Sequence, residues 1–176
     1  MALHPSIKVG PSRIAGKGLI AVRKIPAGTI IWTYDPSDVI KYTAAQYRQF
    51  SPRYQARLRK HAYTDYSGNI IYPRGTTRYF NHSCDPNCTD ANREDWAVAL
   101  RDIRKGEEIT YDYGLLMGRW EPALKCACGS SGCRRKIGPM NHSSNAFKNL
   151  MRRARKALQG MHKVPQPLLT SLKLPA

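Results

Sequence analysis

The sequence predicts a mainly β fold that contains one short helical insert. Short runs of apolar, β-branched and aromatic residues alternate with glycine or proline turns along most of the chain. Residues 43–62 differ, because many of them are residue types with adequate helix propensity. A β-rich core with a small helical insert accounts for both patterns.

The first 34 residues are expected to form strands. A glycine turn within residues 14–19 leads into an apolar run over 19–22. A second turn, at residues 26–28, precedes a β-branched and aromatic run over 29–32. We therefore expect two short strands in this region, each introduced by a turn.

The insert at residues 43–62 is predicted to hold two short helices, because Ser51-Pro52 interrupts the helix-compatible stretch. Chain-reversing turns are expected at 67–69 and 104–107. The strands predicted after the insert cover residues 70–72, 97–100 and 109–113.

The composition changes at about Met140. Apolar residues recur near a helical period over the next stretch and predict a basic amphipathic helix at about residues 144–160. Prolines at 165, 167 and 175 then indicate an extended or disordered end. Three interpretations of this tail remain open: it contacts DNA phosphates, it covers the domain with its apolar stripe, or it is disordered.

The charge of the chain is strongly positive. Lys and Arg number 29 and Asp and Glu number 12, which gives a net charge of +17. Residues 139–176 carry seven basic residues and residues 41–60 carry six, with no acidic residue in either segment. Such fields attract nucleic acid, acidic proteins or anionic lipid, but they also occur on ordinary solvated faces.

Several classes of protein are disfavoured. The 176 residues are 41% hydrophobic, which suits one compact domain with a tail. No run of about 18 apolar residues is present, so we expect no membrane-spanning helix and no membrane partner. The N-terminus lacks the pattern of a secretory signal. We expect an intracellular protein, cytoplasmic or chromosome-associated, and nuclear in a eukaryote.

The cysteines predict a metal site. Their number is five, which is odd, and all of them lie in two short segments, residues 84–88 and 126–133, unlike a disulfide framework. Cys126, Cys128 and Cys133 supply three thiols within eight residues, which is an incomplete tetrahedral zinc site. Cys84 and Cys88 are the candidates for a fourth ligand. The alternative is a set of unmetallated thiols in a flexible segment.

Four motifs occur in a familiar order: residues 16–18 (GKG), 78–87 (RYFNHSCDPN), 106–114 (GEEITYDYG) and 126–133 (CxCx4C). Together they resemble the SET domain of protein-lysine methyltransferases followed by a post-SET zinc segment. The resemblance implies a SET-type fold of several small sheets with a pseudoknot, in a minimal form that lacks a pre-SET region.

The resemblance also implies domain boundaries. The SET domain is expected over residues 6–114, with its helical insert at about 43–62. The post-SET zinc segment then covers residues 115–138. The basic C-terminal tail occupies residues 139–176.

The resemblance assigns roles to particular residues. S-adenosylmethionine is the implied methyl donor, and its binding residues are Gly16, Lys17, Gly18, Tyr63, Asn81 and His82. The implied catalytic residues are Tyr113, which orients the amine and the methyl group, together with Tyr111 and Tyr34. The implied Zn²⁺ ligands are Cys84, Cys126, Cys128 and Cys133, which leaves Cys88 spare.

The expected activity is methyl transfer to the side-chain amine of a lysine in a protein, either a histone or another nucleic-acid-associated protein. A tyrosine at position 111 implies a preference for monomethylation. The basic segments suggest an additional, non-specific contact with nucleic acid. The alternative is a catalytically silent zinc-binding module that binds nucleic acid or a partner protein through its basic faces. Binding of S-adenosylmethionine distinguishes the two, because the silent module has no need of it.

Overall fold

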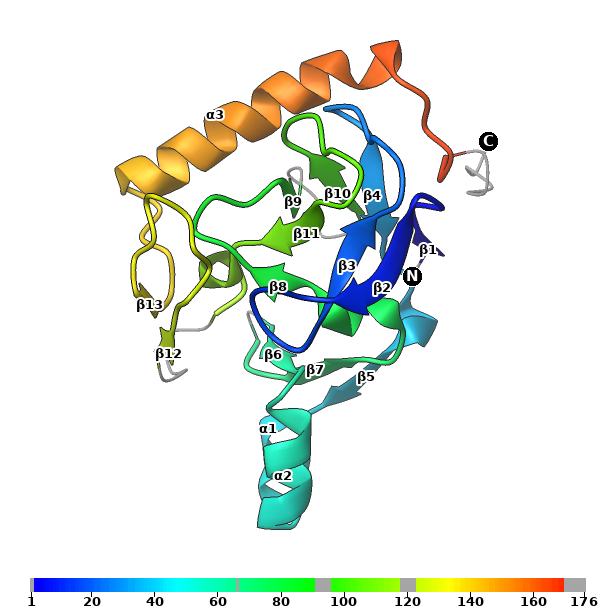
Figure 1. Cartoon of the computed structure of the whole chain (residues 1–176). Coiled ribbons are helices and arrows are strands. Elements are labelled where there is room, and N and C mark those ends of the chain that lie inside the picture. The colour runs from blue at the N-terminus through cyan, green and yellow to red at the C-terminus, as the bar shows by residue number, and fades with distance from the viewer. Residues whose placement is uncertain (1, 66, 91–95, 118–122, 170–176) are drawn as a thin grey trace.

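The computed structural model describes residues 2–65, 67–90, 96–117 and 123–169. Within these residues the strands form four small sheets and the helices are few (Figure 1). The expectation of a mainly β, SET-type fold with several small sheets is confirmed.

The first sheet has the strand order β1-β4-β10-β9, and its strands are antiparallel. The register places Ala97 opposite Trp32 and Val98 opposite Ile30, with a shift between Ala97 and Val98. Such a shift is typical of a β-bulge, in which one strand carries an extra residue. The strands are β1 (Ala2–Leu3), β4 (Ile30–Thr33), β9 (Cys88–Asp90) and β10 (Trp96–Ala99).

The second sheet has the order β2-β3-β11-β8. Its last pair is parallel and aligns Thr110 with Asn81 and Tyr111 with His82. Because parallel strands cannot be joined by a tight turn, the chain makes a long excursion between β8 and β11. The strands are β2 (Ile7–Pro11), β3 (Lys17–Ala21), β8 (Asn81–His82) and β11 (Glu108–Tyr111).

The chain beyond β8 remains tied to β11. The amide of Ser83 donates to the carbonyl of Tyr111 at 3.0 Å. The fully buried side chain of Asn87 donates to the carbonyl of Glu108 at 2.8 Å and accepts from the amide of Thr110 at 2.9 Å. These bonds hold residues 81–87 against β11, as the predicted pseudoknot requires.

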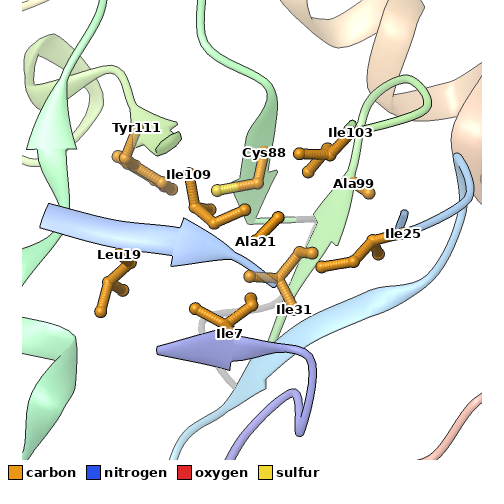
Figure 2. Packing of buried hydrophobic residues seen from close by; sticks show 10 residues of the cluster. All are labelled: Ile7, Leu19, Ala21, Ile25, Ile31, Cys88, Ala99, Ile103, Ile109 and Tyr111. Atoms are coloured by element: carbon orange, nitrogen blue, oxygen red, sulfur yellow. The ribbon is translucent and has the colours of Figure 1, made fainter. Parts of the chain in front are cut away.

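The core lies between these two sheets (Figure 2). Its members are apolar residues at alternate strand positions together with two turn isoleucines: Ile7, Leu19, Ala21, Ile25, Ile31, Cys88, Ala99, Ile103, Ile109 and Tyr111. Cys88 is fully buried, and burial raises the pKa of its thiol. It therefore packs as a small apolar residue.

The insert forms the two predicted helices, and the strands that flank it form a separate sheet that was not predicted. The order is β5-β7-β6, with β5 (Val39–Tyr42), β6 (Tyr63–Thr64) and β7 (Ile70–Pro73). Thr43 and Gln46 form a capping box at α1 (Ala44–Gln49), and Ser51 caps α2 (Pro52–Leu58), which begins with proline. Both helices project from one end of the molecule (Figure 1). Short 3₁₀ turns flank this sheet: η1 (Pro36–Asp38) and η2 (Thr76–Tyr79).

The longest helix, α3 (Asn145–Gly160), begins at the cap residue Ser144 and packs on β10. Ala157 contacts Val98, and Leu150 and Ala154 contact Leu100. Gly28, at φ +85°, allows this approach, because a Cβ there would lie 2.8 Å from the carbonyl oxygen of Ala157. The apolar stripe of the tail thus covers the domain, which is one of the three interpretations, and contact with DNA phosphates stays a prediction.

The residues after α3 also attach to the domain, although an extended or disordered end was expected. They begin with the turn η4 (Met161–Lys163). Gln166 accepts from the amide of Ile30 at 2.9 Å and donates to the carbonyl of Gly28 at 2.8 Å, and Leu168 is buried. Pro175 lies outside the described residues. None of the helices in the described part of the chain is long and apolar enough to cross a membrane.

Candidate functional site

Asn81 joins two of the sequence motifs. It lies on β8, is 9% exposed, and its side-chain Nδ2 donates to the carbonyl of Lys17 at 2.9 Å. The same nitrogen lies 3.2 Å from the carbonyl of Ala15 and 2.7 Å from the Oε1 atom of Glu108. The early glycine motif and the Asn-His motif, far apart in sequence, therefore meet through one amide.

Glu108 is a residue that the sequence analysis missed. Its carboxylate accepts from the hydroxyl of Ser12 at 2.8 Å as well as from Asn81. A Cβ at Gly18 would lie 2.2 Å from its Oε1 atom, so the absence of a side chain at position 18 makes room for the carboxylate. The sequence feature that could have pointed to Glu108 was an acidic residue within a predicted motif of a chain that has few acidic residues.

The backbone near Gly16 is open on one side. Gly16 has a φ of +50°, and no heavy atom lies within 4 Å of the place where a Cβ would stand. A surface cavity of about 550 Å³ is lined here by Val9, Gly10, Pro11, Gly16 and Lys17. That volume is within the range of small-molecule sites. A ligand can approach this backbone without a side chain in the way, so the segment fits the predicted cofactor.

Tyr113 begins the turn η3 (Tyr113–Leu115), which is separated from β11 by the cap residue Asp112. Its hydroxyl donates to the carbonyl of Phe80 at 2.5 Å. Burial and the negative charge of Glu108 raise the pKa of this hydroxyl to about 12. Tyr113 is therefore a neutral phenol at physiological pH, fitted to orient a group by hydrogen bonding.

His82 contacts Tyr113. Their ring centroids lie 5.4 Å apart, and the amide of Tyr113 donates to His82 Nδ1 at 3.1 Å. Burial lowers the pKa of His82 to about 4, so the ring is neutral at pH 7. With Nδ1 as an acceptor, the proton lies on Nε2, which is 3.3 Å from the Sγ atom of Cys84.

Tyr111 and Tyr113 do not share a face, because β11 ends at Tyr111 and the chain turns. The Tyr111 ring is buried in the core, and its hydroxyl donates to Asp90 at 2.5 Å. Burial and the adjacent Asp90 raise the pKa of Tyr111. The hydroxyls of the two tyrosines thus have different partners, Asp90 for one and Phe80 for the other.

The other two tyrosines with implied roles come from elsewhere. Tyr34 follows β4 directly and is half-buried. Tyr63 lies on β6, paired with Ile71 in the sheet of the insert. Neither belongs to the sheet that carries Asn81, and their roles stay predictions.

Four cysteines gather into one cluster. The Sγ atoms of Cys84, Cys126, Cys128 and Cys133 lie within 4.8 Å of one another. Cys84 and Cys126 are 3.7 Å apart, and Cys126 and Cys133 are 3.6 Å apart. Tetrahedral zinc with Zn–S bonds of about 2.3 Å places its sulfur ligands about 3.8 Å apart. The donors therefore fit zinc, and the fourth cysteine is Cys84, while Cys88 lies in the core.

Local backbone geometry supports this cluster. The strands β12 (Leu124–Lys125) and β13 (Lys136–Ile137) bracket three of the cysteines. Gly129 and Arg135 have positive φ values of 73° and 62°, which fold the loop back on itself. The amide of Arg134 donates to Cys84 Sγ at 3.3 Å, and the amide of Cys84 donates to Cys128 Sγ at 3.4 Å. Such bonds favour thiolates, the form that binds metal.

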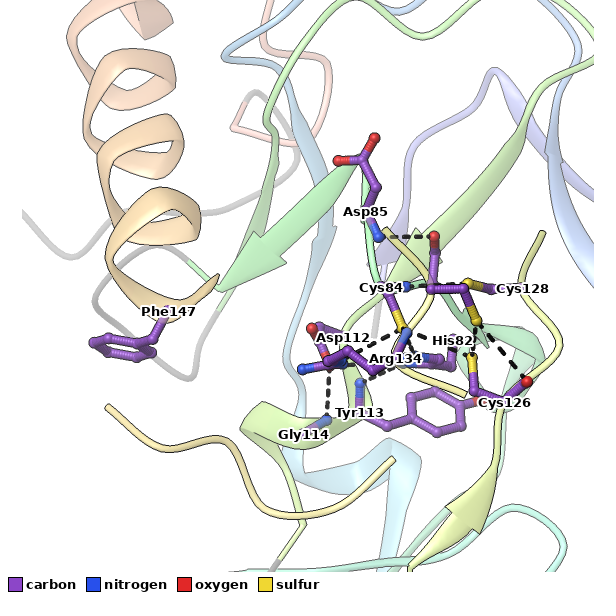
Figure 3. A network of polar contacts seen from close by, with 12 residues as sticks. His82, Cys84, Asp85, Asp112, Tyr113, Gly114, Cys126, Cys128, Arg134 and Phe147 are labelled. Carbon is purple, nitrogen blue, oxygen red and sulfur yellow. Dashed lines mark hydrogen bonds and ion pairs between the residues drawn. The ribbon is translucent and has the colours of Figure 1, made fainter. Parts of the chain in front are cut away.

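Arg134 connects the cysteine cluster to the turn that carries Tyr113 (Figure 3). Its Nε lies 3.4 Å from Cys84 Sγ, and its Nη2 lies 2.6 Å from Asp112 Oδ1. Asp112 is buried and accepts from the amide of Gly114 at 2.9 Å. The segment that carries the cysteines is thereby fastened beside His82 and Tyr113.

Comparisons with known proteins agree with this arrangement. Residues 16–114 match the SET domain family. Histone-lysine N-methyltransferase ASHH2 of Arabidopsis thaliana is 32% identical over 142 residues, which cover 72% of this chain and 8% of that protein. A histone-lysine N-methyltransferase of Mycosarcoma maydis, described as H3 lysine-4 specific, is 33% identical over 139 residues, which cover 73% of this chain and 9% of that protein.

A third relative extends further along both chains. Histone-lysine N-methyltransferase ASHH3 of Arabidopsis thaliana is 28% identical over 164 residues, which cover 84% of this chain and 44% of that protein. The chain thus spans less than half the length of each of these relatives.

Proposed function

Because this chain belongs to the SET domain family, we propose that it transfers a methyl group from S-adenosylmethionine to the side-chain amine of a protein lysine. One observation carries the proposal: Asn81 bonds the Lys17 carbonyl at 2.9 Å, next to His82, which contacts Tyr113. Two motifs assigned to cofactor binding and the tyrosine assigned to catalysis thus adjoin one another.

The cofactor would be held by the backbone of residues 16–18 and by Asn81 and His82. When bound, S-adenosylmethionine supplies an electrophilic methyl group. Neutral His82 offers no positive charge to repel a cationic cofactor, because its pKa is lowered to about 4. The open side of Gly16 lets a ligand reach the main chain.

Tyr113 would orient the lysine amine. A lysine with a pKa of about 10.4 is almost fully protonated at pH 7, and removing the proton there costs roughly 4.6 kcal/mol. A phenol with a pKa of about 12 is not a base at this pH. The hydroxyl therefore acts by positioning, and burial beside aromatic rings lowers the pKa of the incoming amine.

We propose a histone as the substrate, on the support of relatives that are described as histone-lysine N-methyltransferases. The site of action would then be chromatin. The proposed main product is monomethyl-lysine, because the SET resemblance implies this preference for a tyrosine at position 111; the hydroxyl of Tyr111 is held by Asp90. Zn²⁺ held by the four cysteines would be structural, since all four donors are protein thiols.

The test is incubation of the purified chain with core histones and methyl-labelled S-adenosylmethionine, followed by mass spectrometry. Tyr113→Phe removes the positioning hydroxyl, and Tyr54→Phe makes the same change on α2, where the hydroxyl faces Tyr42. We expect label on a lysine with the wild type and with Tyr54→Phe, and at least a tenfold loss with Tyr113→Phe. The absence of both label and cofactor binding would leave the silent zinc module as the explanation.

A further inference from the structure

The outward face of α3 is a stripe of cations. Lys148, Arg152, Arg155 and Lys156 are exposed, and we name these four residues the α3 stripe. At 100° per residue they fall within an arc of about 100° on the helix. The remaining exposed residues of α3 are uncharged: Asn145, Ala146, Asn149 and Gln159.

No acid of the same segment neutralises this stripe, since residues 139–176 contain no Asp or Glu. Arg153 lies off the stripe, and its guanidinium pairs with Asp85 at 2.7 Å and donates to the carbonyl of Pro86 at 2.7 Å. This pair anchors the helix to the segment that carries Cys84. The α3 stripe is thus a fixed feature of the folded surface.

We propose that the α3 stripe binds the phosphate backbone of nucleic acid without sequence preference. From Lys148 to Lys156 the helix rises about 12 Å, at 1.5 Å per residue. Phosphates on one strand of a duplex recur about every 3.4 Å along the axis, so the stripe faces three or four of them. Lys and Arg are the side chains that make such contacts.

Two other polyanions fit the stripe less well. A helix that lies on anionic lipid inserts its apolar face into the membrane, but here Leu150, Ala154 and Ala157 are already packed on the domain. Interfaces with acidic proteins depend on apolar or aromatic anchors, and the exposed face of α3 has none. A partner that is recognised by its charge alone therefore fits the α3 stripe best. This proposal does not depend on the proposed methyl transfer.

The opposite end of the molecule provides a matched control. Arg48, Arg53, Arg57 and Lys60 are exposed on and beside α1 and α2, which project away from α3 (Figure 1). Changing either set of four to glutamine lowers the net charge from +17 to +13. A loss of binding that follows only from total charge would be equal in the two variants.

The experiment measures anisotropy of a labelled 20-base-pair duplex of mixed sequence with the full chain, between 50 and 200 mM NaCl. We expect the α3 variant to bind at least tenfold more weakly than the wild type at 100 mM. The slope of log affinity against log salt should decrease in magnitude by about 3 to 4, because each lost phosphate contact contributes roughly 0.9 to it. The insert variant should stay within about threefold of the wild type.

Equal losses in the two variants, or no loss in the α3 variant, would overturn the proposal. So would α3-dependent binding to phosphatidylserine vesicles or to polyglutamate without α3-dependent binding to DNA. Circular dichroism and thermal melting check that both variants are folded, which we expect because all eight side chains are exposed.

Discussion

The side-chain amide of Asn81 donates to the main-chain carbonyl of Lys17 across 64 positions of sequence, at 2.9 Å. This bond joins β8 to the start of β3, strands that are not neighbours in their sheet, since β11 lies between them. Glu108, on β11, bonds the same amide from the strand in the middle. One buried side chain therefore holds the three strands that form the proposed cofactor site.

Gly18→Ala should damage this junction through Glu108. The new Cβ would lie 2.2 Å from Oε1, so the carboxylate must move and lose its bonds to Asn81 and Ser12. We expect a loss of about 0.5–1.5 kcal/mol of stability, typical of lost hydrogen bonds, measured by urea unfolding, because half-buried Glu108 can turn toward solvent and Asn81 keeps its bond to the Lys17 carbonyl. Gly132→Ala is the control, because nothing lies within 4 Å of its Cβ position. A stability loss of equal size in both variants would contradict the explanation.

Tyr111→Phe should raise the degree of methylation. The substitution removes the hydroxyl on which the proposed monomethyl preference depends, and it leaves Asp90 without that donor. On histone substrate, we expect mass spectrometry to show a shift from monomethyl-lysine toward dimethyl- and trimethyl-lysine. The same product distribution as that of the wild type would show that Tyr111 does not control the product.

Replacing a cluster cysteine should release the metal. With four thiol ligands, we expect one zinc per chain in the wild type by atomic emission, and less than 0.2 in Cys126→Ser. Cys88→Ala is the control, because Cys88 lies in the core outside the cluster, and it should retain its zinc. Since Arg134 ties the cluster to Asp112, metal loss should also lower the melting temperature. Equal zinc in all three proteins would contradict the assignment.

Asp65 should make stability depend on pH at the acid end. Burial alone would raise its pKa, but Lys41 at 2.8 Å and the bonds from Asn69 lower it to about 2. Because the folded pKa is below the unfolded value, the stabilisation is present above about pH 4 and is lost as the pH falls through 2. Asp65→Asn should cost about 1 kcal/mol at pH 6, since solvent screens the pair. A cost that did not shrink between pH 4 and 2 would refute this.

Local features of the fold were predictable because local chemistry determines them. Thr43 and Ser51 begin helices where their side chains can cap free amides. The cysteine spacing likewise predicted three ligands within one loop. The spacing alone could not decide whether Cys84 or Cys88 supplies the fourth thiol, because this depends on which side of β9 faces the core.

Features that depend on tertiary contacts could not be predicted from the sequence. Glu108 gains its role from Ser12 and Asn81, each on a different segment. Strand alternation would place Tyr111 and Tyr113 on one face, but the chain leaves β11 at Tyr111 and enters a 3₁₀ turn. The helix in the tail could be predicted from the spacing of its apolar residues. Its packing could not, because it depends on Val98 and Leu100, about 50 residues earlier in the chain.

The most direct test of the central claim is calorimetric titration of S-adenosylmethionine into the wild type and into Asn81→Ala. Asn69→Ala is the control, because it removes an amide that bonds Asp65 in the insert, outside the site. The account predicts one site per chain in the wild type and in Asn69→Ala, and at least tenfold weaker binding in Asn81→Ala. Binding of equal strength in all three proteins, or none in the wild type, would contradict it.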